Sequence, residues 1–335
     1  MVCTVFILLV YLLLILFGSQ WKNVDDTEHF MNREYTNVLK GLCCVLVVIV
    51  HVPSTYNNPL QQAVGGFSQV SVTFYFLFSA YGILESIKSK PDYLLHFWRN
   101  RLPSLLIPFV LSSMVKMLIG VEPGSGGTYF VFVLLLFYVI TYIAAKYYSN
   151  RMICIVCVAV SIYSIMGSIT GWLHWPTQAL GFCYGALLAQ YLPVFSHWMK
   201  RRYWFKLSAI TVFAAFFTFV YAVIEPAISE FANVILQNIM VLFLILWVFM
   251  ITFRLKLGNF ASKYLGSISY DIFLYHGLVQ VLMKSLDENS VRVNLSSGVF
   301  LLLMMLFSIL LSAATHVVNS YILQHVKKKY TPSKC

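Results

Sequence analysis

Long apolar segments separated by short polar loops dominate the pattern of this chain. A helix that crosses a membrane needs about 20 apolar residues, within a range of about 17–25. Segments close to that length occupy 3–18, 38–54, 63–87, 102–120, 128–146, 152–170, 174–194, 206–224, 231–253, 266–285 and 297–325. The pattern therefore predicts an all-α integral membrane protein, a polytopic bundle of 10–11 transmembrane helices with no soluble domain.

The first apolar segment, 3–18, is the shortest of the series. No basic residue precedes it and no small-residue cleavage site clearly follows it, so we interpret it as a retained transmembrane helix rather than a cleaved signal peptide. The chain then divides into three predicted parts. These are an N-terminal helix with its cytoplasmic loop (1–37), a membrane domain (38–325) and a basic cytoplasmic tail (326–335).

Composition and charge agree with a membrane protein. Of 335 residues, 60% are hydrophobic and 10% are charged, whereas soluble domains average about 45–50% and about 25%. Of the 23 Lys and Arg residues, all except Lys116, Lys284 and Arg292 fall in alternate loops or in the tail. Because cytoplasmic loops collect these residues, the C-terminus is predicted to be cytoplasmic, and the N-terminus external if all eleven segments span. The net charge of +11 then reflects topology and not nucleic-acid binding.

Two of the seven cysteines, Cys154 and Cys157, form a CxxC pair inside an apolar segment. A zinc site would need further ligands at suitable spacing, and the sequence provides no matching pair. A buried free cysteine packs like a small hydrophobic residue. We therefore predict packing roles for the cysteines, with neither a metal site nor a disulfide framework.

An apolar segment that ends in His51 is the first candidate for chemistry. His51 follows Lys40 by eleven residues, so in a helix both lie on nearly one face, with His51 about 16 Å farther along. Ionisable groups at membrane depth indicate function by default. His51 is predicted to act as a general base or an acyl acceptor. The alternative is an inert histidine that caps the outer end of its helix before Pro53.

Basic and hydroxyl residues follow in the next two segments. Arg99 and Arg101 are suited to recognising phosphates through their guanidinium groups, although either could simply anchor a cytoplasmic loop. We expect residues 92–101 to form an amphipathic surface helix, and Pro103 and Pro108 to break the helix that follows. Ser79 and Tyr81 are candidate pocket hydroxyls, and the alternative for Ser79 is close helix packing.

The segment 266–276 combines Ser269, Tyr270, Asp271 and His276 in an apolar context. Asp271 and His276 lie about 140° apart on a straight helix, so they cannot both face one point. A buried acid needs a partner, and the structural alternative for Asp271 is an ion pair with a Lys or Arg of another helix. His316 is interpreted as a surface or interface residue.

These residues, in this order, resemble the membrane-bound acyltransferase family 3, the integral-membrane O-acyltransferases of bacterial surface polysaccharides. The likeness covers roughly 38–325. The residues that carry it are Lys40, His51, the run Ser79-Ala80-Tyr81, Arg101, Leu180 to Gly185 (LGFCYG), Gly266, Ser269, Tyr270, Leu274 and His276. Lys40 stands where the family more often has Arg, Ala80 replaces a Gly, and Ser104 replaces a second Arg.

The resemblance implies an acyltransferase of the bacterial inner membrane with acetyl-CoA as cytoplasmic donor. Its acceptor would be a sugar hydroxyl of a surface polysaccharide or a lipid-linked oligosaccharide. His51, Tyr81 and Ser79 are then predicted to be catalytic, and Arg99, Arg101 and Lys40 to bind the donor. Ser269, Tyr270, Asp271 and His276 would contact substrate or hold the structure. Two rival hypotheses stay open: a transporter that flips a glycan or a lipid-linked sugar, and a non-enzymatic subunit whose motifs have decayed.

Overall fold

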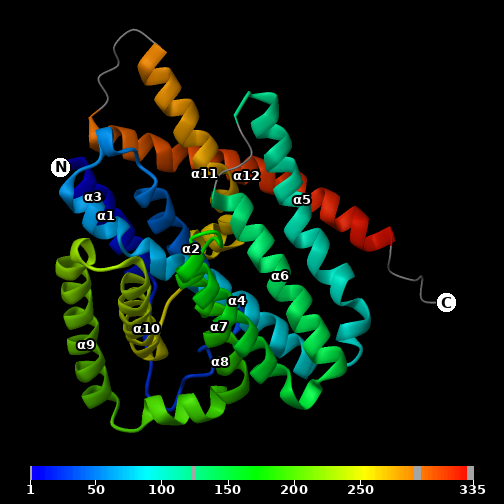
Figure 1. Cartoon of the computed structure of the whole chain (residues 1–335). Coiled ribbons are helices and arrows are strands. Elements are labelled where there is room, and N and C mark those ends of the chain that lie inside the picture. Colours follow the sequence, from blue (N-terminus) through cyan, green and yellow to red (C-terminus); the bar gives the residue numbers. More distant parts are fainter. Residues whose placement is uncertain (1, 122–125, 290–295, 330–335) are drawn as a thin grey trace.

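The computed structural model describes residues 2–121, 126–289 and 296–329, and this part of the chain is almost entirely helical (Figure 1). The helices are α1 (Val2–Leu16), α2 (Arg33–Val50), α3 (Pro59–Gly65), α4 (Ser68–Ser89), α5 (Phe97–Leu118), α6 (Gly126–Tyr147), α7 (Met152–Thr170), α8 (Pro176–Lys200), α9 (Tyr203–Ile224), α10 (Glu230–Arg254), α11 (Phe260–Asn289) and α12 (Ser297–Lys329). Two short strands, β1 (Gln20–Trp21) and β2 (Leu255–Lys256), pair antiparallel. Arg292 and the end of the predicted tail, 330–335, lie outside the described residues.

The predicted membrane bundle is confirmed. In the described part of the chain, eight helical stretches are long and apolar enough to cross a membrane. Outside these eight are α1, whose apolar part is only Thr4–Leu16, and the more polar helices α2 and α11. Because α2 and α11 pack along each other and bury much of their length inside the bundle, they can carry polar residues that a lipid-facing helix would not tolerate.

The structure corrects two sequence-based expectations about single elements. Residues 92–101 do not form an amphipathic surface helix, because a 3-10 turn (Tyr93–His96) leads directly into α5. Pro103 and Pro108 do not break α5, which is continuous from Phe97 to Leu118. Each proline removes only one backbone N–H, whereas unwinding the helix in lipid would expose several unsatisfied backbone groups. The predicted span 63–87, in contrast, lies within Pro59–Ser89, one of the eight stretches long and apolar enough to cross a membrane, although α3 ends and α4 begins inside it.

Glycines set the closest helix contacts of the bundle. A Cβ atom on Gly181 or Gly185 of α8 would overlap the backbone of α4 at Thr73 or Leu77. Glycines four residues apart let two membrane helices approach closely. This packing explains the glycines of the 180–185 segment, and it aligns α4 and α8 in parallel (Figure 1).

A second glycine contact joins α2 to α11. A Cβ atom on Gly41 would lie 2.5 Å from the backbone nitrogen of Gly266, and one on Gly266 would overlap the carbonyl oxygen of Asn37. The two helices therefore touch backbone to backbone, also in parallel. The helices α4, α8 and α10 finish at the end of the bundle where α11 begins. We call this end the basic end, since it carries Lys88, Lys200, Arg254 and Lys263.

Candidate active site

The imidazole rings of His51 and His276 form a pair at the end of the bundle opposite to the basic end. Their ring centroids are 4.4 Å apart and the ring planes meet at 67°. His51 is the C-cap residue of α2, and His276 is buried in α11. Each histidine thus comes from one of the two helices that meet at the glycine contact.

Hydrogen bonds fix the tautomer of both rings. Nδ1 of His51 lies 2.7 Å from the carbonyl oxygen of Val47, and Nδ1 of His276 lies 3.1 Å from that of Ile272. Because a carbonyl oxygen can only accept, each Nδ1 carries the hydrogen. In a neutral imidazole Nε2 then keeps its lone pair. Both rings can therefore present a base through Nε2.

The capping alternative for His51 describes part of what the structure shows. His51 ends α2 and bonds a carbonyl of its last turn, as a capping histidine does. This bond uses only Nδ1, and the ring packs against His276 rather than facing outward. Capping and a chemical role for Nε2 are therefore compatible.

Arg101 is held at a second centre by α4 and by the turn before α5. Its Nε donates to the Tyr93 hydroxyl (2.6 Å), and its Nη2 donates to the carbonyl oxygen of Gly82 (3.0 Å). The guanidinium group also lies over the Tyr93 ring, 5.8 Å from its centroid. These contacts aim one guanidinium group inward from α5.

A second cation and a hydroxyl pair accompany Arg101. The Lys40 ammonium group of α2 lies within electrostatic range of the Arg101 guanidinium group, and so does the Tyr138 hydroxyl of α6. Ser79 of α4 shares a 2.7 Å hydrogen bond with Tyr138. We call Lys40, Ser79, Tyr93, Arg101 and Tyr138 the Arg101 group. Two cations that repel each other and are held together are suited to binding an anion.

Arg99 and Tyr81 lie near the Arg101 group but not within it. Arg99 precedes Arg101 by two residues in α5 and so lies about 200° away around the helix. Tyr81 is buried in α4 near Glu85. Because α4 runs toward the basic end, Ser79 and Tyr81 lie about 6 Å and about 9 Å beyond Tyr75 in that direction. The structure thus places both hydroxyls near Arg101 rather than beside His51.

Tyr75 and Phe273 connect the Arg101 group to the histidine pair. The Tyr75 hydroxyl donates to the carbonyl oxygen of Lys40 (3.2 Å). The Tyr75 and Phe273 ring centroids are 5.8 Å apart, and those of Phe273 and His276 are 6.0 Å apart. A molecule that reached from one centre to the other would pass along these two rings.

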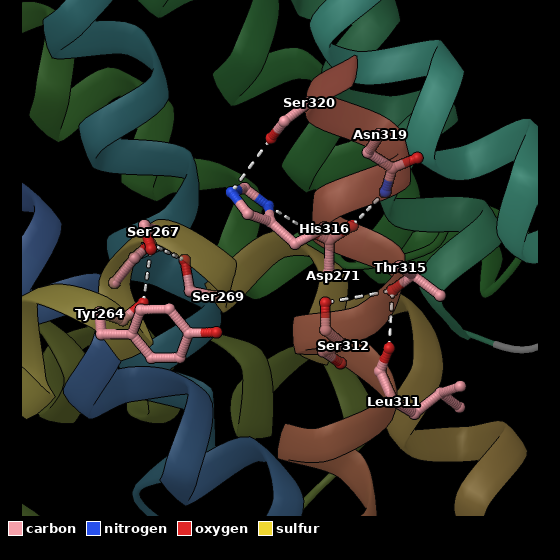
Figure 2. Close-up of polar contacts among 11 residues, drawn as sticks. Tyr264, Ser267, Ser269, Asp271, Leu311, Ser312, Thr315, His316, Asn319 and Ser320 are labelled. Carbon is pink, nitrogen blue, oxygen red and sulfur yellow. Dashed lines mark hydrogen bonds and ion pairs between the residues drawn. The ribbon is translucent and has the colours of Figure 1, made fainter. Parts of the chain in front are cut away.

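The polar residues of α11 face three different helices. Ser269 donates to the carbonyl of Gly266 in its own helix (2.9 Å), and Tyr270 donates to the carbonyl of Leu105 in α5 (2.9 Å). Asp271 faces α12, as Figure 2 shows, whereas His276 faces α2. This divergence agrees with the 140° separation expected from the sequence.

The partners of Asp271 correct the expectation of a Lys or Arg. One carboxylate oxygen lies 2.7 Å from His316 Nδ1 and the other 2.5 Å from Asn319 Nδ2. Both partners lie on α12 (Figure 2). A histidine and an amide replace the expected cation because α12 has no Lys or Arg between its first residue and Lys327.

Comparison with known proteins decides the class of this protein. The sequence pattern of an acyltransferase domain matches residues 33–317. The chain belongs to the acyltransferase 3 family. No curated protein and no solved structure matched the chain. The family match establishes a membrane acyltransferase and decides against the transporter and the decayed subunit.

Sequence reasoning about this acyltransferase missed two features of the site. It did not pair His276 with His51, although both stand ten residues after a glycine of the helix contact. It also did not recognise His316, for which the available signal was a histidine and an asparagine three residues apart in a long, mostly apolar helix. Within the described part of the chain, no three His, Cys, Asp or Glu residues are arranged to hold a metal ion.

Proposed function

We propose that this acyltransferase transfers an acetyl group from cytoplasmic acetyl-CoA to a sugar hydroxyl of a cell-surface glycan. The acceptor would be O-antigen, capsule, exopolysaccharide or a lipid-linked precursor, and the reaction would take place in the bacterial inner membrane. The observation that carries the proposal is the His51–His276 pair, with both Nε2 atoms available as bases. The basic end would face the cytoplasm, as the distribution of Lys and Arg indicates.

The Arg101 group is the proposed site for the donor phosphates. Arg101 is oriented by two hydrogen bonds, and Lys40 adds a second positive charge from α2. Guanidinium groups match the geometry of phosphate oxygens. Arg99, on another side of α5, would meet a different part of the same polyanion. Ser79 and Tyr81, which lie on this side of the molecule, would then line the donor path.

The thin pantetheine arm of the donor would extend past Tyr75 and Phe273 to the histidine pair. Lys40 and His51 are about 16 Å apart along α2, a distance that an extended arm can cover. At the pair, His51 Nε2 would remove the proton of the acceptor hydroxyl as its oxygen attacks the thioester carbonyl carbon. The C–S bond breaks, and the leaving thiolate takes up the proton from the imidazolium group.

His276 would assist His51 in this step. It holds its own proton on Nδ1 through Ile272 and packs against the His51 ring. The contact fixes the orientation of the His51 ring, and a fixed base gains rate by proximity. Tyr270 contributes by holding α11 against α5 through its bond to the Leu105 carbonyl, whereas the bond of Ser269 to Gly266 lies within α11.

A labelling assay tests the proposal. Membranes that contain the acyltransferase are incubated with acetyl-labelled CoA and with surface glycan isolated from cells that lack it. The proposal predicts label in the glycan and a mass increase of one acetyl group per modified sugar. Transfer of glycan across the membrane without label, or label only from a longer acyl donor, would contradict it.

A further inference from the structure

A second arrangement of reactive groups lies between α11 and α12, away from the His51–His276 pair. Among the described residues, His316 is the histidine whose ring is bonded to a carboxylate, at 2.7 Å from Asp271. Its other ring nitrogen, Nε2, lies 3.4 Å from the hydroxyl oxygen of Ser320. Figure 2 shows His316 between the two. Carboxylate, imidazole and hydroxyl thus follow one another in the order of a nucleophile-activating triad.

The hydrogen bonds set the imidazole in the tautomer that such a triad needs. The Asp271 carboxylate accepts from Nδ1–H of His316, which leaves the Nε2 lone pair toward Ser320. Asn319 donates to the second carboxylate oxygen at 2.5 Å. The carboxylate is therefore fixed from two sides, and its side chain is only 4% exposed.

Ser320 departs from the usual behaviour of hydroxyl residues in this bundle. Ser86, Thr141 and Ser168 each donate to the carbonyl oxygen four residues earlier in their helix, as such residues commonly do in membrane helices. The residue four before Ser320 is His316, and the Ser320 hydroxyl contacts the Nε2 atom of its ring at 3.4 Å instead of its carbonyl oxygen.

The triad is also reachable from outside the packed core. The side chain of His316 is 34% exposed, in contrast to Asp271, and Ser320 is half-buried. Ser320 precedes the Lys327–Lys329 run by seven residues, or about 10 Å of helix. That run marks the side from which the proposed cytoplasmic donor would arrive.

We propose that Asp271, His316 and Ser320 form a second acyl-transfer site, in which Ser320 accepts an acyl group from a thioester. Ser320 Oγ attacks the thioester carbonyl carbon while its proton moves to His316 Nε2. The C–S bond breaks, the thiolate takes that proton, and the products are a free thiol and an acyl-serine ester. A hydroxyl acceptor then attacks the ester by the reverse proton route. The identity of the thioester as acetyl-CoA rests on the proposed function, but the activation of Ser320 does not.

A fluorophosphonate probe, which reacts with activated serines, tests the proposal in the full-length protein in native membranes. Peptide mass spectrometry then locates the label. We expect label on Ser320 in the wild-type protein and a decrease of about tenfold or more in His316→Gln, since a general base contributes about 10²–10⁴. Ser308→Ala is the matched control, because Ser308 is a buried serine of the same helix whose hydroxyl makes no hydrogen bond to any residue that the structure describes. It should leave Ser320 labelling unchanged.

A second measurement protects the test against misfolding of the His316 variant. Ser320→Cys and Ser113→Cys are alkylated with iodoacetamide, because Ser113 is also half-buried but bonds only the Phe109 carbonyl of its own helix. The rate for Cys at position 320 should be the faster by about tenfold. Absence of label on Ser320 in wild-type protein that is inserted in the membrane at the normal level would overturn the proposal, whatever the glycan assay shows. Label on Ser320 without glycan acetylation would instead overturn the proposed function and leave the triad standing.

Discussion

His51 and His276 stand in register across α2 and α11. Each lies ten residues beyond the glycine at which its helix touches the other, Gly41 in α2 and Gly266 in α11. Because the helices run in parallel, the backbone contact at the glycines brings the two imidazole rings to a centroid distance of 4.4 Å. The geometry of the proposed catalytic pair therefore depends on a contact about 15 Å away along both helices.

The glycine contact gives the first prediction. Gly266→Ala should lower acyl transfer strongly, because its Cβ would overlap the Asn37 carbonyl and separate α2 from α11. Overpacking of this kind costs about 1–3 kcal/mol of stability. Thermal unfolding in detergent and labelled transfer measure the two effects.

Gly277 provides the matched control for this variant. It lies in the same helix, and a Cβ there would meet no atom within 4 Å. Gly277→Ala should be as stable as the wild-type protein or more stable, since glycine is unfavourable within a helix. Equal activity of the Gly266→Ala and Gly277→Ala variants would show that the helix contact does not position the histidines.

The second prediction concerns Arg101. Arg101→Gln should raise KM for acetyl-CoA by about 10-fold or more with little change in kcat, because a hydrogen bond to a charged group contributes about 1.5–3 kcal/mol. Arg101→Lys should give an intermediate KM, since it keeps the positive charge but loses the planar set of guanidinium N–H donors. Arg201→Gln removes an exposed cation at the same end of the bundle and should leave KM unchanged. A normal KM in the Arg101→Gln variant would show that Arg101 does not bind the donor.

The third prediction tests the path between the two centres. Tyr75→Trp places a larger ring between Lys40 and Phe273, and we expect it to lower kcat by hindering the donor arm. Tyr75→Phe removes only the hydroxyl bond to Lys40, which is worth about 0.5–1.5 kcal/mol, and should keep most of the activity. Steady-state kinetics of both variants provide the measurement. Normal turnover of Tyr75→Trp would show that the donor arm takes another route.

The fourth prediction concerns pH and the loop before α2. His29 donates through Nε2 to the Thr252 carbonyl (3.1 Å). Burial is the main cause that lowers the pKa of His29, and the positive charges of Lys256 and Lys22 lower it further. The bond to Thr252 and the charge of Asp26 raise this pKa, but the net direction is downward. A histidine whose pKa is lower in the folded state stabilises the fold above its unfolded pKa of about 6.5. This stabilisation is lost as the pH falls below that value.

The His29→Gln variant tests that linkage. Its thermal stability should fall less than that of the wild-type protein between pH 7 and pH 5. His197→Gln, which changes an exposed histidine of α8, should follow the wild-type curve. Identical pH dependence in all three proteins would show that His29 does not titrate with unfolding.

Hydropathy predicted most of the fold, because each spanning helix must be apolar over nearly its whole length. The predicted segment 152–170 coincides with α7. Helix geometry also correctly separated Asp271 from His276, since five residues always turn a helix by about 140°. Local rules were less reliable for α5, where Pro103 and Pro108 lie inside a continuous helix. There the surrounding lipid, rather than the local sequence, decides whether the helix persists.

The partners within the site could not be predicted. Ser79 pairs with Tyr138 and Asp271 with His316 across different helices, and no periodicity in one helix encodes which neighbour it meets. The His51–His276 pair follows from the glycine register only once α2 and α11 are known to be parallel neighbours. Tertiary packing thus determines the polar contacts that hydropathy leaves open.

The most direct test of the catalytic claim is the rate of labelled acetyl transfer to glycan by the His51→Ala variant. General-base catalysis contributes about 10²–10⁴ in rate, so we expect a loss of at least about 100-fold in protein that is inserted at the normal level. His325→Ala, which removes an exposed histidine whose ring is tilted at 45° to that of Tyr321, should transfer label at the wild-type rate. A His51→Ala variant with near-normal transfer would contradict the assignment of His51 as the base.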